Sequence, residues 1–80
     1  MSFVAECFWP DLHRDAVNEL AERIRGTASE LAGVQLTGTL LLPADEVVFF
    51  MFDGDSVDAV RDACTRAQVP FERVLESVTL

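Results

Sequence analysis

One carboxylate stands out among the residues that could do chemistry. Glu6 lies between Val4 and Phe8 in a run that is otherwise apolar from residue 3 to residue 9. In a strand, alternation puts these three side chains on one face. A carboxylate among apolar neighbours needs a reason. Glu6 is therefore predicted either to act as a general acid, general base or ligand donor inside a cavity, or to pair with an arginine such as Arg73 at the rim of a sheet.

Five further side chains are candidates for the same site. Phe8 and Trp9 end the first apolar run and could line a pocket mouth, or could lie in the core or an interface. Thr37 and Thr39 share one face of a later strand if alternation is strict, and could offer hydroxyls to a ligand, although threonine also simply suits strands. His13 is the sole histidine. It could bind a metal together with the carboxylate, or could cap a helix or lie exposed.

The two cysteines do not form a reactive motif. Cys7 and Cys64 lack the Cys-x-x-Cys spacing and are predicted to be buried, reduced thiols. The chain also has no serine–histidine–acid set, phosphate-binding loop or zinc-ligand spacing. These motifs are specific, so their absence argues against the enzyme classes that depend on them.

The composition narrows the possible partners. The chain has 80 residues, with six basic and fourteen acidic side chains and a formal net charge of −8. Such a charge repels nucleic-acid phosphates and anionic membrane surfaces. No apolar run is long enough to cross a membrane, and the first residues do not have the pattern of a signal peptide. The sequence therefore predicts a cytoplasmic protein that binds neither nucleic acid nor membrane.

The elements that position these residues follow from the spacing of apolar side chains. Apolar residues at helical spacing predict two amphipathic helices, and alternating or continuous apolar runs predict four strands. Pro43 is predicted to occupy the second position of a type I turn, and Gly33 to end the first helix. The predicted order is strand 3–9, helix 14–32, strand 34–42, strand 47–52, helix 57–67 and strand 71–80.

This order predicts a single α+β domain over residues 1–80 with the ferredoxin-like βαββαβ fold, a four-stranded antiparallel sheet with both helices on one face. The hairpin over residues 40–52 is apolar on both strand faces, but the helices can cover only one. Half of the chain is hydrophobic, which is more apolar surface than so small a monomer easily buries. We therefore expect a homodimer joined through the bare sheet face, a dimeric α/β barrel whose inter-sheet space forms the pocket.

Four short segments resemble a known family. They are residues 3–6 (FVAE), 41–46 (LLPADE), 60–63 (VRDA) and 69–74 (VPFERV). Together they are similar to small ferredoxin-like proteins of unassigned role, mostly bacterial, which include actinobacterial-type nickel-binding proteins. The resemblance implies Ni²⁺ as a possible ligand and matches Glu6 to a glutamate of the first strand. Gly38 and Ala63 stand where nickel-binding members tend to have histidine.

The leading expectation is thus a homodimeric binding protein whose inter-sheet cavity holds a divalent metal, which the resemblance suggests is nickel, or a small apolar ligand. The ligand pocket is predicted from Glu6, Phe8, Trp9, Thr37 and Thr39, and a metal from Glu6 with His13. An alternative is a cofactor-independent dimeric α/β-barrel enzyme of the monooxygenase, isomerase or cyclase type, with Glu6 as acid or base. A third possibility is a sheet face that docks on a different protein.

Overall fold

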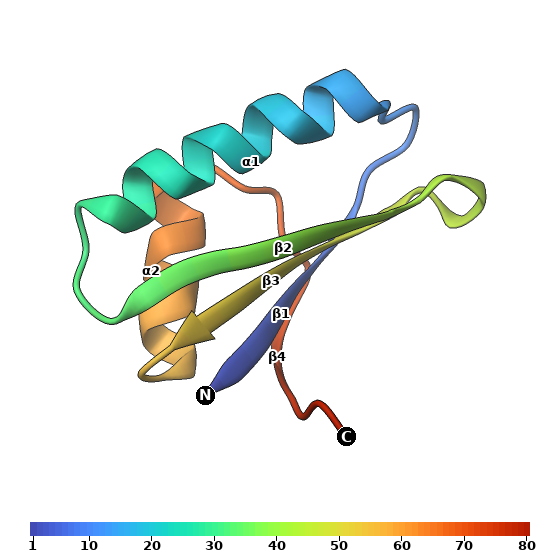
Figure 1. Ribbon diagram of the computed structural model, residues 1–80. Helices are drawn as coiled ribbons and strands as arrows, with labels where there is room; N and C mark the ends of the chain where they lie inside the picture. The colour runs from blue at the N-terminus through green and yellow to red at the C-terminus, as the bar shows by residue number, and fades with distance from the viewer.

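The computed structural model describes residues 1–80 and shows a layer of two helices on a four-stranded sheet (Figure 1). The predicted order of strands and helices is confirmed. Along the chain the elements are β1 (Ser2–Phe8), α1 (Arg14–Ser29), β2 (Val34–Leu42), the short 3₁₀ helix η1 (Pro43–Asp45), β3 (Val47–Gly54), α2 (Val57–Arg66) and β4 (Arg73–Ser77).

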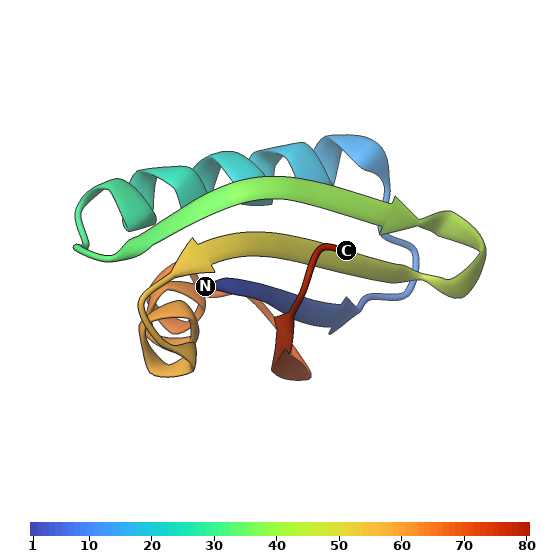
Figure 2. The same ribbon diagram turned by 60° about the horizontal axis from the view of Figure 1, so that its bottom comes forward.

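The sheet has the spatial order β2-β3-β1-β4, and every neighbouring pair is antiparallel. Both helices lie on the same side of it, as Figures 1 and 2 show. This is the predicted ferredoxin-like βαββαβ arrangement. The opposite side of the sheet carries no helix, and only the segment after β4 passes in front of it in Figure 2.

The core lies between the sheet and the helices. A cluster of 16 buried hydrophobic residues includes Phe50 and Phe52 from β3, Leu20 and Ile24 from α1, and Val60 from α2. The helical spacing of these side chains on each helix and their alternation on each strand put them on one surface. Burial of this surface is the main stabilising contribution to the fold.

Helix boundaries are set by local capping. Ser56 caps α2, because its hydroxyl oxygen accepts a hydrogen bond from the backbone N–H of Ala59 at 3.1 Å. α1 ends at Ser29, three residues earlier than predicted, with Glu30 as its C-cap. Gly33 has a φ of 79°, so its left-handed conformation serves the connection to β2 rather than the helix end itself.

The turn of the hairpin and the last strand also differ from prediction. Pro43 begins a 3₁₀ turn rather than a type I turn, and Glu46 closes it in the left-handed region with a φ of 55°. β4 is shorter than predicted, because the chain pairs with β1 only from Arg73 to Ser77.

A β-bulge in β2 changes which side chains face the helices. The register shifts between Leu36 and Gly38, so Leu36 pairs with Phe52 while Gly38 pairs with Met51. The extra residue interrupts strict alternation. As a result Leu36 faces the helices, whereas Gly38 and Leu40 face the opposite side.

None of the helices combines the length and the apolar character needed to cross a membrane.

Candidate functional site

The candidate site is the side of the sheet that the helices leave uncovered, which we call the open face (Figure 2). Its side chains are those that alternate with the core residues along each strand. Most are apolar, and Phe8, Leu40 and Leu75 are between 40% and 52% exposed. The apolar members of the open face are Val4, Phe8, Leu40, Leu42, Val47, Phe49, Met51 and Leu75.

The register arranges these residues in rows across the sheet. The central row runs from Leu40 through Phe49 and Glu6 to Arg73. A second row runs through Met51, Val4 and Leu75, and a third joins Leu42, Val47 and Phe8. Glu6 therefore lies in the middle row, between an aromatic neighbour on β3 and an arginine on β4.

Glu6 forms an ion pair with Arg73. The Nε of Arg73 donates a hydrogen bond to Oε1 of Glu6 at 2.9 Å. The Glu6 side chain is 26% exposed and the Arg73 side chain 60% exposed. Glu6 was predicted either to act inside a cavity or to pair with an arginine at the rim of the sheet. The structure of a single chain shows the arginine pair.

The open face carries little net charge although the protein is strongly acidic. Its two carboxylates are both paired, Glu6 with Arg73 and Asp53 with the amino group of Met1 at 3.1 Å. The other acidic residues lie on the helices, in connections or, like Glu76 opposite Phe3, on the helix side of the edge strand. The net charge of −8 is thus concentrated away from the open face.

The structure divides the predicted pocket residues between two sides of the sheet. Phe8 lies on the open face with Glu6, but Trp9 packs against the core cluster. Thr39 pairs with Phe50 and therefore points to the helix side, where its Oγ1 is buried without a hydrogen-bond partner. Thr37 turns its hydroxyl to the carbonyl oxygen of Met51 at 3.1 Å. The prediction that the two threonines share a face is wrong because of the bulge at Thr37.

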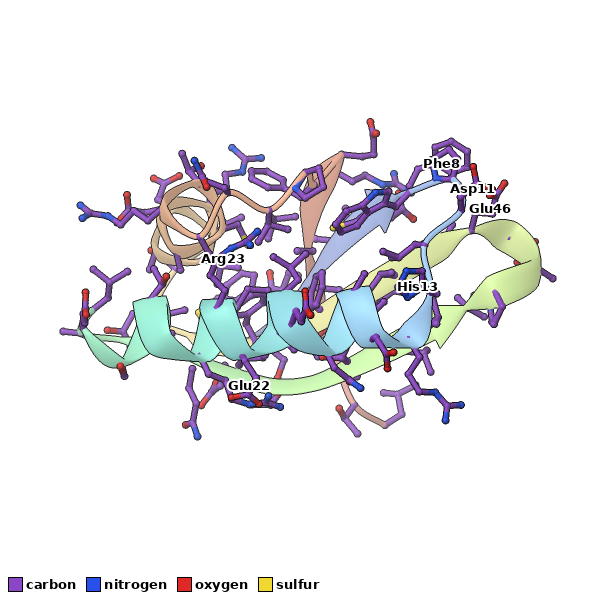
Figure 3. The ribbon with its side chains drawn as sticks, turned by 90° about the horizontal axis from the view of Figure 1, so that it is seen from above. Phe8, Asp11, His13, Glu22, Arg23 and Glu46 are labelled. Atoms are coloured by element: carbon purple, nitrogen blue, oxygen red, sulfur yellow. The ribbon has the colours of Figure 1, made fainter.

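His13 lies away from Glu6. It is the exposed N-cap residue of α1, in the helix layer, and its side chain makes no capping hydrogen bond (Figure 3). Glu6 is on the opposite side of the sheet. These two residues therefore do not form a shared metal site within one chain.

The donors of a single chain do not fit a nickel site. No three His, Cys, Asp or Glu side chains come together closely enough to hold a metal ion. The Arg73 guanidinium beside Glu6 also opposes a cation at that carboxylate. Of the two positions that the resemblance matches to histidines, Gly38 lies on the open face, whereas Ala63 is buried in the core on α2. The sheet separates them.

A contact that sequence patterns did not predict fixes the end of the sheet next to Phe8. The backbone N–H of Asp11 donates to Oε2 of Glu46 at 2.8 Å, and that of Trp9 donates to the Glu46 carbonyl oxygen at 2.9 Å. Figure 3 shows Phe8, Asp11 and Glu46 together where the two connections meet. Asp11 and Glu46 both have positive φ. A glycine at either position would have indicated a left-handed backbone in the sequence, whereas other residue types adopt it uncommonly.

No hollow lies over the centre of the open face, around Glu6 and Arg73. Three surface hollows of about 250, 280 and 320 Å³ lie between α1 and β2 or at the sheet end near Asp53 and Asp55. A cavity over the open face would therefore need a second wall.

The cysteines are inert. Cys7 and Cys64 are free and fully buried, as predicted. Burial is the largest cause that raises the pKa of Cys7 to about 12, with smaller contributions from the charges of Cys64, Glu72 and Glu6. Burial likewise raises the pKa of Cys64 to about 12. Because the thiolate is the nucleophile, these thiols have no reactive form near neutral pH.

Comparison with known proteins identifies the fold but no family. No family model and no curated protein matches the sequence. Among solved structures, the crystal structure of SCO4226 from Streptomyces coelicolor A3(2) matches with a TM-score of 0.87 at 15% sequence identity, covering 100% of this chain and 99% of that chain. At that identity the similarity shows a shared fold alone: this chain has the βαββαβ fold of the Streptomyces protein over its whole length.

Proposed function

We propose that two copies of this chain pack their open faces together and hold a small apolar ligand between the sheets, with the Glu6–Arg73 pair as the polar centre of the site. The observation that carries this proposal is the apolar, charge-balanced open face of an otherwise acidic molecule. A monomer that exposes such a face is unusual, because contiguous apolar patches of this kind mark interaction or ligand sites.

The distribution of charge favours a second copy as the partner. Two molecules of net charge −8 repel one another at a distance, but the open face is where that repulsion is weakest, since both of its carboxylates are paired. A two-fold interface also needs a self-complementary surface. An apolar face with balanced charge meets that condition, whereas a basic partner would be drawn to the acidic helices instead.

The size of the face is also sufficient. The molecule measures 32 × 28 × 18 Å along its principal axes. A stable interface takes about 800 Å² from each partner, and a face with the two longer dimensions can supply that area. Sheets packed face to face lie about 10 Å apart, so side chains fill most of the space and a ligand would be small.

We place this homodimer in the cytoplasm, because free and buried thiols are typical of proteins from reducing compartments. The ligand is proposed to be organic rather than a metal, since the donors of the chain do not form a metal site by themselves.

The test is the oligomeric state of the protein and of one variant. Sedimentation equilibrium is expected to give a dimer at micromolar concentration. Leu40 is 50% exposed in one chain, so covering it would stabilise the dimer by about 1 kcal/mol per copy. Leu40→Glu would remove that contribution and place a carboxylate in an apolar interface, which costs several kcal/mol more. Because the change occurs twice in a two-fold dimer, Kd should rise by about 1000-fold or more.

Asn18→Asp is the matched control, since it adds the same charge on α1 in the helix layer. It should leave dimerisation unchanged. A monomeric native protein, or a Leu40→Glu variant that dimerises as well as the native chain, would refute the proposal. Native mass spectrometry after dialysis against Ni²⁺ tests the metal: uptake that Glu6→Gln abolishes would favour nickel over an organic ligand.

A further inference from the structure

We infer that the ligand carries a carboxylate that binds the free end of Arg73. This inference rests on the proposed function and names the chemical class that the same site would accept, an apolar monocarboxylate.

The Glu6–Arg73 pair leaves most of the guanidinium without a partner. Arginine has five N–H donors, but the only hydrogen bond of the Arg73 side chain runs from Nε to Oε1 of Glu6. The two terminal nitrogens, Nη1 and Nη2, donate to no group in the chain. Their planar, paired geometry matches the two oxygens of a carboxylate.

The surroundings of Arg73 make these free donors costly once the open face is covered. Glu6 and Phe49 share its row, and Val4 and Leu75 form the next row. In a single chain, water can solvate the Arg73 side chain, which is 60% exposed. A second sheet packed over it would displace that water, and a buried donor without a partner is destabilising.

The second copy offers no unpaired side-chain carboxylate to these donors. In a two-fold interface it presents the same face, and the two carboxylates of that face, Glu6 and Asp53, are already paired. We therefore assign the missing acceptor to the ligand. The apolar side chains around Arg73 require the rest of the ligand to be aromatic or aliphatic.

The test compares two probes that share one ring system, 2-naphthoate and the neutral 2-naphthamide, by isothermal titration calorimetry on the full chain. A charge-assisted pair is expected to make naphthoate bind about tenfold or more tightly than the amide. Arg73→Gln should abolish this preference. Arg61→Gln should retain it, because Arg61 is an exposed arginine on α2 that forms no ion pair.

Glu6→Gln gives the discriminating result. It removes the carboxylate that competes for the guanidinium, so naphthoate should bind more tightly than to the native protein, whereas Arg73→Gln weakens binding. If the pair served only to stabilise the interface, both variants would weaken binding. Glu6→Gln also keeps the arginine, so the inference stays testable if Arg73→Gln does not fold.

Sedimentation of the same samples separates the two proposals. A dimer that binds both probes equally, or binds neither, would overturn the carboxylate ligand and leave the homodimer standing. A monomer would overturn both.

Discussion

The two buried thiols predict a loss of stability at alkaline pH. Burial raises the pKa of Cys7 and of Cys64 from 9.0 to about 12 in the folded protein. Below pH 9 the thiols are protonated in both the folded and the unfolded chain, and their contribution to stability is complete. Between pH 9 and 12 the unfolded chain releases these protons while the folded chain keeps them, so the free energy of unfolding falls as pH rises.

The magnitude follows from the number of protons. Each thiol lowers the free energy of unfolding by about 1.4 kcal/mol per pH unit within this window. At pH 10 the two thiols together should lower the free energy of unfolding by about 3 kcal/mol relative to pH 8. This is a large part of the total free energy of unfolding of a native protein, which is commonly about 5–15 kcal/mol. The chain contains no lysine and no tyrosine, so no other side chain ordinarily titrates in this range.

Urea denaturation at pH 8 and pH 10 measures this loss, at one protein concentration and with a reductant to prevent disulfide formation. Cys64→Ala should remove about half of the difference between the two pH values, and the variant with alanine at both positions should remove nearly all of it. A native protein with equal stability at pH 8 and 10 would refute the reasoning. So would a double variant that keeps the full decline.

Three substitutions test the local contacts that hold the fold, each by chemical denaturation at neutral pH. Ser56→Ala should destabilise the protein by about 1 kcal/mol because α2 loses its N-cap, and an unchanged midpoint would show that the cap contributes nothing. Gly33→Ala should cost about 1–2 kcal/mol, since its φ of 79° disfavours a side chain and the new Cβ would meet the Asp55 carboxylate; a stabilised variant would contradict this. Arg23→Met keeps the apolar stem but loses the hydrogen bond from Nε to the Ala67 carbonyl at 2.7 Å, so it should cost about 1 kcal/mol, and a loss below measurement error would argue against that contact in solution.

Predictions from the sequence succeeded where the position of a side chain depends only on the residues next to it in the same helix or strand. Apolar spacing gave both helices, because an amphipathic helix must turn one stripe to the core. Alternation in β1 correctly put Val4, Glu6 and Phe8 on one face, because no irregularity interrupts that strand. The free cysteines also behaved as predicted.

The bulge in β2 shows where pattern reasoning failed. Thr37 and Gly38 gave no distinct signal of an extra residue, yet the register shift there sends Thr39 to the helix side. A single inserted residue reverses the facing of every later side chain in a strand. Thr39 therefore does not lie with the other predicted pocket residues, because the bulge at Thr37 turns it to the helix side.

The carboxylate of Glu6 illustrates the division between sequence and structure. The sequence by itself determined which side chains of the strand share its face and that these are apolar, because both depend on the alternation of adjacent residues. Only the tertiary structure decided its partner. Arg73 lies 67 positions away and reaches Glu6 through the β1–β4 register, and a register between distant strands is fixed by the packing of the whole sheet rather than by any local pattern.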